Sequence, residues 1–194
     1  MNLVERVKGI LLKPKDEWEN VRTEATTVQE LFMQYAVILA AIPAISGLIG
    51  KTVFGMSIGF NSIHIPFGTS IGWAVVSYLF SLVGVYIVGY IIDALAPSFD
   101  CSKDLVQSMK VPVYAMTASW VGGIFTIFPP LSFLSFLAGI YSLVLMYIGL
   151  KSVKQVPQEK MLGYFVVVIL ITIVVYIVIG AITSAVFFRS YMMP

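Results

Sequence analysis

Few side chains in this sequence could carry out chemistry, and the acid Asp93 stands out among them. It follows the apolar stretch 70–92, in which Tyr78, Tyr86 and Tyr90 recur at four- or eight-residue spacing. Residues spaced in this way share one side of a helix, so we expect a polar stripe that faces the protein interior. The stripe could hydrogen-bond between helices or line a path for a cation or proton. Asp93 could equally be an ordinary acid at headgroup depth, where ionisation costs little.

Metal binding has weak support in the sequence. Asp93, Asp100 and Asp104 could offer oxygen ligands to a hard cation, but their spacing matches no known loop motif. Asp100 and Asp104 fit better near the start of the next helix, where negative side chains favour the positive end of the dipole. His64 is the single histidine and cannot form a histidine cluster within one chain. We therefore expect no metal and no cofactor.

The sequence contains no motif that indicates an enzyme. The sequence contains no Ser/His/Asp set that we can assign, no phosphate-binding Gly-Lys-Ser/Thr loop and no paired histidines of a metalloprotease. Cys101 is the single cysteine, so an intrachain disulfide cannot form, and we expect a reduced, inert thiol. The chain is predicted to be non-enzymatic.

The composition is that of a membrane protein. Hydrophobic residues make up 59% of the chain and charged residues 11%, and the mean hydropathy is +0.94. Spanning the hydrocarbon layer takes about 20 residues of helix. The sequence therefore predicts an all-α, polytopic integral membrane protein with five transmembrane helices in one domain, 31–194. The five apolar stretches are at about 31–50, 70–92, 111–128, 131–150 and 162–187.

The basic residues indicate how the spans are oriented. Ten of the twelve Lys and Arg residues fall on one side of the five predicted crossings, and only Lys51 and Arg189 fall on the other. The positive-inside rule then places the N-terminus in the cytoplasm and the C-terminus outside. We expect the plasma (inner) membrane of a prokaryote. A net charge of +2 does not suggest a nucleic-acid partner, and the lipid bilayer is the expected counter-charge.

Residues 1–30 form a cytoplasmic amphipathic segment. Apolar residues between Leu3 and Leu11 recur at helical spacing, which predicts a short helix along the interface. Pro14 suits the first turn of a second helix, in which Trp18 could anchor the segment at headgroup depth. The alternative is that Trp18 packs under the bundle.

Small residues recur every four positions in the last three predicted spans, which favours close helix packing. Such a bundle leaves little room for a wide pore within one chain, and a homo-oligomer remains open. Pro43 and Pro112 would suit broken helices that free carbonyls for ions. The small-residue rows are Ala115, Ser119 and Gly123, then Ser135 and Gly139, then Gly180 and Ser184.

Several short motifs, in order along the chain, resemble the prokaryotic branch of the Yip-domain (Ypt-interacting-protein) family of five-span membrane proteins. The resemblance implies a cytoplasmic N-terminus and five spanning helices. Eukaryotic relatives are associated with Rab-type GTPases and vesicle traffic, but this chain lacks their long polar N-terminal region, so that role is not carried over. The motifs are VKGILLKPKDEW at 7–18, YIIDALAPSF at 90–99, GIYSL at 139–143, YIGL at 147–150, VPQEK at 156–160 and LGY at 162–164.

Two functions follow as hypotheses. The first is a non-enzymatic interaction or membrane-organising module, whose N-terminal helices rest on the cytoplasmic leaflet and contact lipid or a protein partner that the sequence does not identify. The second is a small cation or proton transporter or channel that uses Asp93 and the Tyr78, Tyr86 and Tyr90 stripe.

Overall fold

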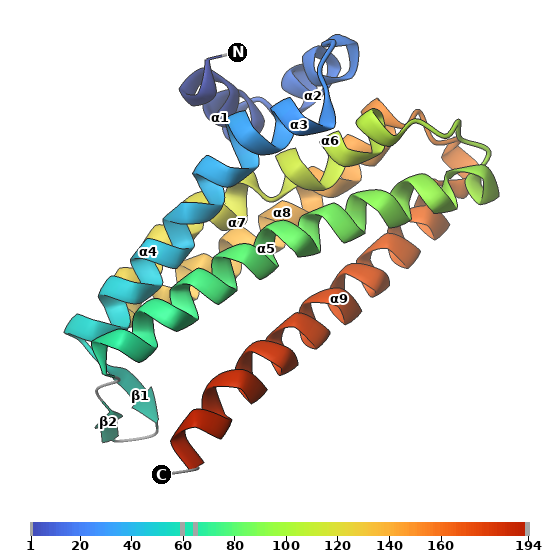
Figure 1. The fold of residues 1–194 in the computed structure, drawn as a ribbon. Coiled ribbons are helices and arrows are strands. Elements are labelled where there is room, and N and C mark those ends of the chain that lie inside the picture. The colour runs from blue at the N-terminus through green and yellow to red at the C-terminus, as the bar shows by residue number, and fades with distance from the viewer. Residues whose placement is uncertain (1, 59–60, 64–65, 193–194) are drawn as a thin grey trace.

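Helices dominate the structure, a computed structural model that describes residues 2–58, 61–63 and 66–192. Figure 1 shows long helices running between two ends of an elongated molecule, with two short helices set across one end. The helices are α1 (Leu3–Leu12), α2 (Pro14–Thr23), α3 (Val28–Leu31), α4 (Val37–Val53), α5 (Phe67–Leu95), α6 (Leu105–Ala115), α7 (Thr117–Gly122), α8 (Ser132–Val153) and α9 (Gln158–Met192). This confirms the predicted all-α class.

Among the described residues, four helical segments are long and apolar enough to cross a membrane. They correspond to the first, second, fourth and fifth predicted spans. A short π-helical stretch, Phe32–Ala36, joins α3 to α4, and a 3₁₀ turn, Ala96–Phe99, extends α5. The segments are Val28–Val53, Phe67–Phe99, Pro129–Val153 and Gln158–Ala185.

The third predicted span, 111–128, is present but broken. It forms α6, α7 and a 3₁₀ stretch, Gly123–Ile127, and a second 3₁₀ turn, Pro129–Leu131, then leads into α8. Pro112 lacks the N–H that would bond within α6, and the helix ends at Ala115. The segment still runs the length of the bundle, because its 3₁₀ end approaches Gly50 near the far end of α4.

Small residues bring this broken segment close to its neighbours. A Cβ atom on Gly122 would lie 2.3 Å from the Cβ of Ala138, and one on Gly123 would lie 2.5 Å from the Cβ of Pro43. The Ser119 and Ser142 hydroxyls are 2.8 Å apart. Ser119 and Gly123, of the row predicted in the third span, therefore lie at helix contacts, and Ser135 of the fourth-span row donates to the Gly122 carbonyl at 2.8 Å.

A two-stranded hairpin connects α4 to α5. Strand β1 (Met56–Ile58) pairs antiparallel with β2 (Asn61–Ile63). His64 lies outside the described residues.

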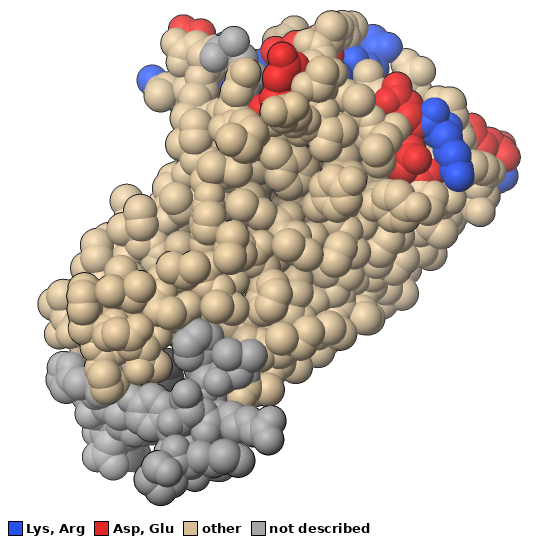
Figure 2. Space-filling model, in the orientation of Figure 1, with Lys and Arg blue, Asp and Glu red and all other residues tan. Residues whose placement is uncertain are grey.

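Charged side chains gather at the end of the molecule that carries α1 and α2 (Figure 2). The described surface between that end and the opposite one is almost entirely uncharged on the face shown. The last described turns of α9 lie at the end opposite α1 (Figure 1). This arrangement agrees with an odd number of crossings.

Candidate functional site

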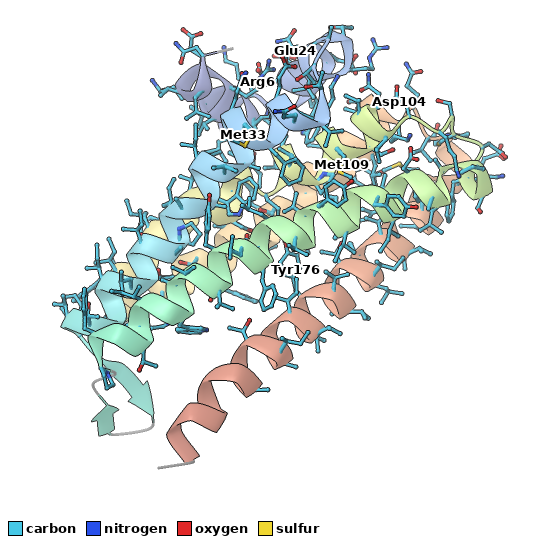
Figure 3. The ribbon with its side chains drawn as sticks, viewed as in Figure 1. Arg6, Glu24, Met33, Asp104, Met109 and Tyr176 are labelled. Carbon is cyan, nitrogen blue, oxygen red and sulfur yellow. The ribbon has the colours of Figure 1, made fainter. Side chains whose placement is uncertain are left out.

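The two N-terminal helices form a unit that we call the platform, residues Leu3–Thr23. Arg6, on α1, is buried and pairs with Glu17 on α2, at 2.5 Å, and with Glu24 just beyond it. The Arg6 guanidinium also lies 5.6 Å from the ring centroid of Tyr114 on α6. Figure 3 shows Arg6 and Glu24 together at this end of the bundle. A buried ion pair of this kind ties α1, α2 and α6 to one another.

A buried lysine on α6, Lys110, bonds to the end of the platform. Lys110 is 1% exposed, and its Nζ donates hydrogen bonds to the backbone carbonyls of Val21 and Glu24, both at 2.7 Å. These carbonyls lie at the C-terminal end of α2, where helical carbonyls lack intrahelical partners and the dipole is negative. Lys110 therefore caps α2 across 89 and 86 residues of sequence.

Trp18 is fully buried, so its ring contacts protein and not the bilayer. The edge of its ring packs against Gly149 of α8, which has no side chain in the way. The ring also packs edge-on against the Tyr114 ring, with 6.2 Å between the centroids. The prediction of a membrane-interface anchor at Trp18 is therefore wrong, and the alternative of packing under the bundle holds. The missing side chain of Gly149 creates the space that the ring fills.

Asp93 belongs to a polar network between helices. Its carboxylate accepts from the Asp104 backbone N–H at 2.9 Å and from the Ser108 hydroxyl at 3.0 Å. Lys154 Nζ donates to the Ser108 hydroxyl at 2.9 Å and to the Ser102 carbonyl at 2.8 Å. Burial lowers the pKa of Lys154, and the Asp93 carboxylate opposes that shift. The network joins the ends of α5, α6 and α8.

The three tyrosines of the predicted stripe do not share one environment. Tyr78 is partly buried and donates to the Val37 carbonyl at 3.0 Å. Tyr86 is 45% exposed and meets the Phe32 ring edge-on, and Tyr90 is 59% exposed. Four residues advance a helix by about 40° beyond one turn, so Tyr78 and Tyr90 point about 120° apart. The stripe therefore drifts from the interior to the surface, and among the described residues no hydrogen bond joins these tyrosines to Asp93.

The acids considered as metal ligands have other roles. Asp104 is the N-cap of α6, where its side chain accepts from the Gln107 N–H at 3.0 Å. Asp100 pairs with Lys160 at 2.5 Å. Across the described part of the chain, no three His, Cys, Asp or Glu side chains converge into a group that could hold a metal.

Cys101 is a free, buried thiol that donates weakly to the Phe99 carbonyl at 3.4 Å. Burial raises the pKa of the thiol, and the charge of Lys154 acts against that shift. A thiol with a raised pKa holds little thiolate at neutral pH, so it is a poor nucleophile.

Sequence reasoning did not single out Arg6, Lys110 or Lys154. Lys110 and Lys154 lie near the ends of apolar stretches, where a base normally extends into the headgroup layer, and Arg6 lies within the amphipathic N-terminal segment. Their acceptors are carbonyls and side chains from distant segments, which spacing along the sequence cannot reveal. Lys110, directly before the apolar run 111–128, carried the best available signal.

Several apolar helices long enough to cross a bilayer, with a charged platform tied to one end, define a polytopic helical membrane protein. The chain belongs to the Yip1 domain family, which matches it over residues 8–181. This confirms the resemblance noted in the sequence.

Two relatives are both named "Inner membrane protein YohC", from Escherichia coli strain K12 and from E. coli O6:H1 strain CFT073. Each is 27% identical over 182 residues, which cover 91% of this chain and 93% of the relative. No solved structure gives a significant match. The chain is thus similar over nearly its whole length to an inner membrane protein.

Proposed function

We propose that this chain is a non-enzymatic membrane-organising module, whose platform rests on the cytoplasmic leaflet and gathers anionic lipid headgroups. The proposal keeps the N-terminus in the cytoplasm and the C-terminus outside. The observation that carries it is the exposed edge of α1. Leu12 is 76% exposed and Val4 is 58% exposed although both are apolar, and Lys8 is exposed between them.

The charge pattern of the platform supports a lipid contact. Val4, Lys8 and Leu12 follow at four-residue intervals, so they lie along one side of α1. Lys13 and Lys15 are exposed where α1 meets α2. Apolar side chains beside lysines are typical of helices that lie in the membrane interface.

Internal ion pairs remove much of the opposing negative charge. Glu17 and Glu24 pair with Arg6, and Glu19 pairs with Arg22. Met33, exposed at the start of the first span, lies at the same end of the molecule as α1 in Figure 3, so the platform lies at the end where the chain enters the membrane. The edge is therefore available to headgroups at that depth.

The test is lipid selectivity in vesicles that contain the full chain. Spin-labelled phosphatidylglycerol should be held at the protein surface more strongly than spin-labelled phosphatidylcholine. A surface lysine near an anionic leaflet contributes about 1 kcal/mol, so Lys8→Gln with Lys13→Gln, which together remove about 2 kcal/mol, should lower this preference by up to about 30-fold. The matched control, Lys103→Gln with Lys151→Gln, changes the same charge at exposed sites outside the platform. Equal loss in both pairs would refute a lipid site specific to the platform, because Lys103 and Lys151 are expected to face the same leaflet.

A second candidate function is cation or proton transport that begins at Asp93. The observation that favours it is the linked chain of polar groups from Asp93 through Ser108 to the buried Lys154. Liposomes with purified protein should then conduct cations or protons, and Asp93→Asn should abolish the flux while helicity stays unchanged. Unchanged flux in Asp93→Asn would exclude Asp93 as the coupling residue.

A further inference from the structure

A cavity of about 280 Å³ lies between α5 and α9, toward the end of the bundle away from the platform. Its walls are rich in hydroxyl groups, and α9 is the least buried of the four long spans, with 11% of its apolar window buried against 28% in the others. An occupant can therefore enter from the bilayer. The lining residues are Trp73, Ser77, Ser81, Tyr176, Ile179, Gly180, Thr183 and Ser184.

The polar lining extends over two facing helices. On α5 the lining residues at four-residue steps are Trp73, Ser77 and Ser81. On α9 they are Tyr176, Gly180 and Ser184. From Trp73 to Ser81 the helix rises about 12 Å. A headgroup layer is only about 5–8 Å thick on each side of the hydrocarbon. The lining therefore extends below the depth at which polar groups meet water.

Tyr176 supplies a hydrogen-bond donor that needs a partner. Its hydroxyl is buried and has no hydrogen-bond partner among the described residues. Figure 3 shows Tyr176 between α5 and α9. Thr183, by contrast, bonds to the Ile179 carbonyl at 2.8 Å, and Ser81 accepts from the Trp120 ring N–H at 3.2 Å. An unpaired buried hydroxyl is unfavourable, so an occupant that offers an oxygen acceptor is stabilised here.

A basic side chain, that of Lys51, lies at the rim of the cavity. The Lys51 ammonium group lies over the face of Trp73, one of the lining residues. Lys51 is also one of only two basic residues that the sequence places on the side opposite the other ten. The positive-inside rule does not account for a lysine on that side. A cation at this place attracts an anion such as a phosphate group.

We propose that this cavity binds the polar region of a single phospholipid from the leaflet opposite the platform. Lys51 holds the phosphate at the rim, Tyr176 donates to an ester or headgroup oxygen at the deep end, and the serine hydroxyls bond between them. The cavity is at the small end of the roughly 300–1,000 Å³ typical of ligand pockets, so the acyl chains lie outside it along the exposed apolar side of α9. The bound lipid is drawn below its usual depth, which thins the membrane locally. This lipid site is separate from the lipid contact proposed for the platform.

Gly180 provides the most direct variant. A Cβ atom at Gly180 would meet nothing within 4 Å, so the side chain of Gly180→Leu starts in open space at the cavity lining, and leucine also favours helix. Gly47, in α4, has the same open surroundings and does not line the cavity, so Gly47→Leu is the matched control.

The experiment is native mass spectrometry of the delipidated full chain titrated with phosphatidylglycerol or with diacylglycerol, which lacks the phosphate. We expect one tightly held phosphatidylglycerol per chain and at least about tenfold weaker binding in Gly180→Leu than in Gly47→Leu. Tyr176→Phe, which keeps the ring, should weaken binding about fivefold, the loss of one hydrogen bond. Lys51→Gln should weaken phosphatidylglycerol binding but not diacylglycerol binding.

Three results would overturn the proposal. The first is equal phosphatidylglycerol binding by Gly180→Leu and Gly47→Leu. The second is equal binding of the two lipids by the unsubstituted chain. Loss of a dimer in Gly180→Leu with lipid binding unchanged would also overturn it, and would assign the cavity to a second copy of the chain.

Discussion

Substitution of Gly149 by alanine should loosen the platform, because Trp18 occupies the space that a side chain would need. A Cβ atom at Gly149 would lie 2.6, 2.8 and 2.9 Å from three carbons of the Trp18 ring. Contacts this short do not persist, so one group must move. The ring is fully buried against Tyr114 and cannot turn away without leaving its site.

The size of the effect follows from two opposing terms. Overpacking a filled site costs about 1–3 kcal/mol. Replacing glycine by alanine inside a helix such as α8 returns up to about 1 kcal/mol. With the full offset the net loss is about 0–2 kcal/mol, with a middle value of about 1 kcal/mol. It falls on the docking of α2, whose open population then increases about fivefold at the middle value and at most about 30-fold.

Hydrogen exchange of residues 14–23 in lipid nanodiscs measures that population. Gly139→Ala is the control, because a Cβ atom there would meet only the Ser119 hydroxyl, at 3.9 Å, on the same helix α8. We expect faster exchange in Gly149→Ala and unchanged exchange in Gly139→Ala. Equal exchange in both variants would refute the docking of Trp18 on Gly149.

Three further predictions concern the same end of the bundle. Lys110→Met leaves the Val21 and Glu24 carbonyls without their donor, so it should destabilise the protein by about 1–3 kcal/mol in thermal unfolding, whereas Lys151→Met at an exposed site should have little effect. Alkylation of Cys101 should be slow at neutral pH and reach half its maximal rate at a higher pH than in the denatured chain, because burial raises the thiol pKa; coincident pH profiles would contradict this. With Cys101 replaced by serine, Glu19→Cys should react with an impermeant maleimide only after the cells are permeabilised, and labelling of intact cells would contradict a cytoplasmic platform.

The spans and the charged end could be predicted because the bilayer acts on local sequence. A helix must satisfy its own backbone groups in hydrocarbon, so about 20 apolar residues suffice to identify a span. The third span was predicted as an apolar segment, but its break was not placed. Pro112 is in that segment, and Pro43 is in α4, which continues through it. Proline alone therefore does not determine where a helix ends.

The site was harder to predict because its contacts join distant segments. Trp18 and Gly149 are far apart in the chain, and nothing near either residue indicates the other. The prediction that the three tyrosines share one inward-facing side of α5 was wrong for a geometric reason. Steps of four residues drift around a helix, so a row that starts inside at Tyr78 ends on the surface at Tyr90.

Photo-crosslinking from position 12 tests the proposed function most directly. With Leu12 replaced by p-benzoylphenylalanine in the native membrane, we expect phospholipid to be the main adduct. The same residue placed at Glu19, exposed on α2, should give few lipid adducts. A protein adduct at position 12 with no lipid adduct would contradict the account and make the platform a protein-binding surface.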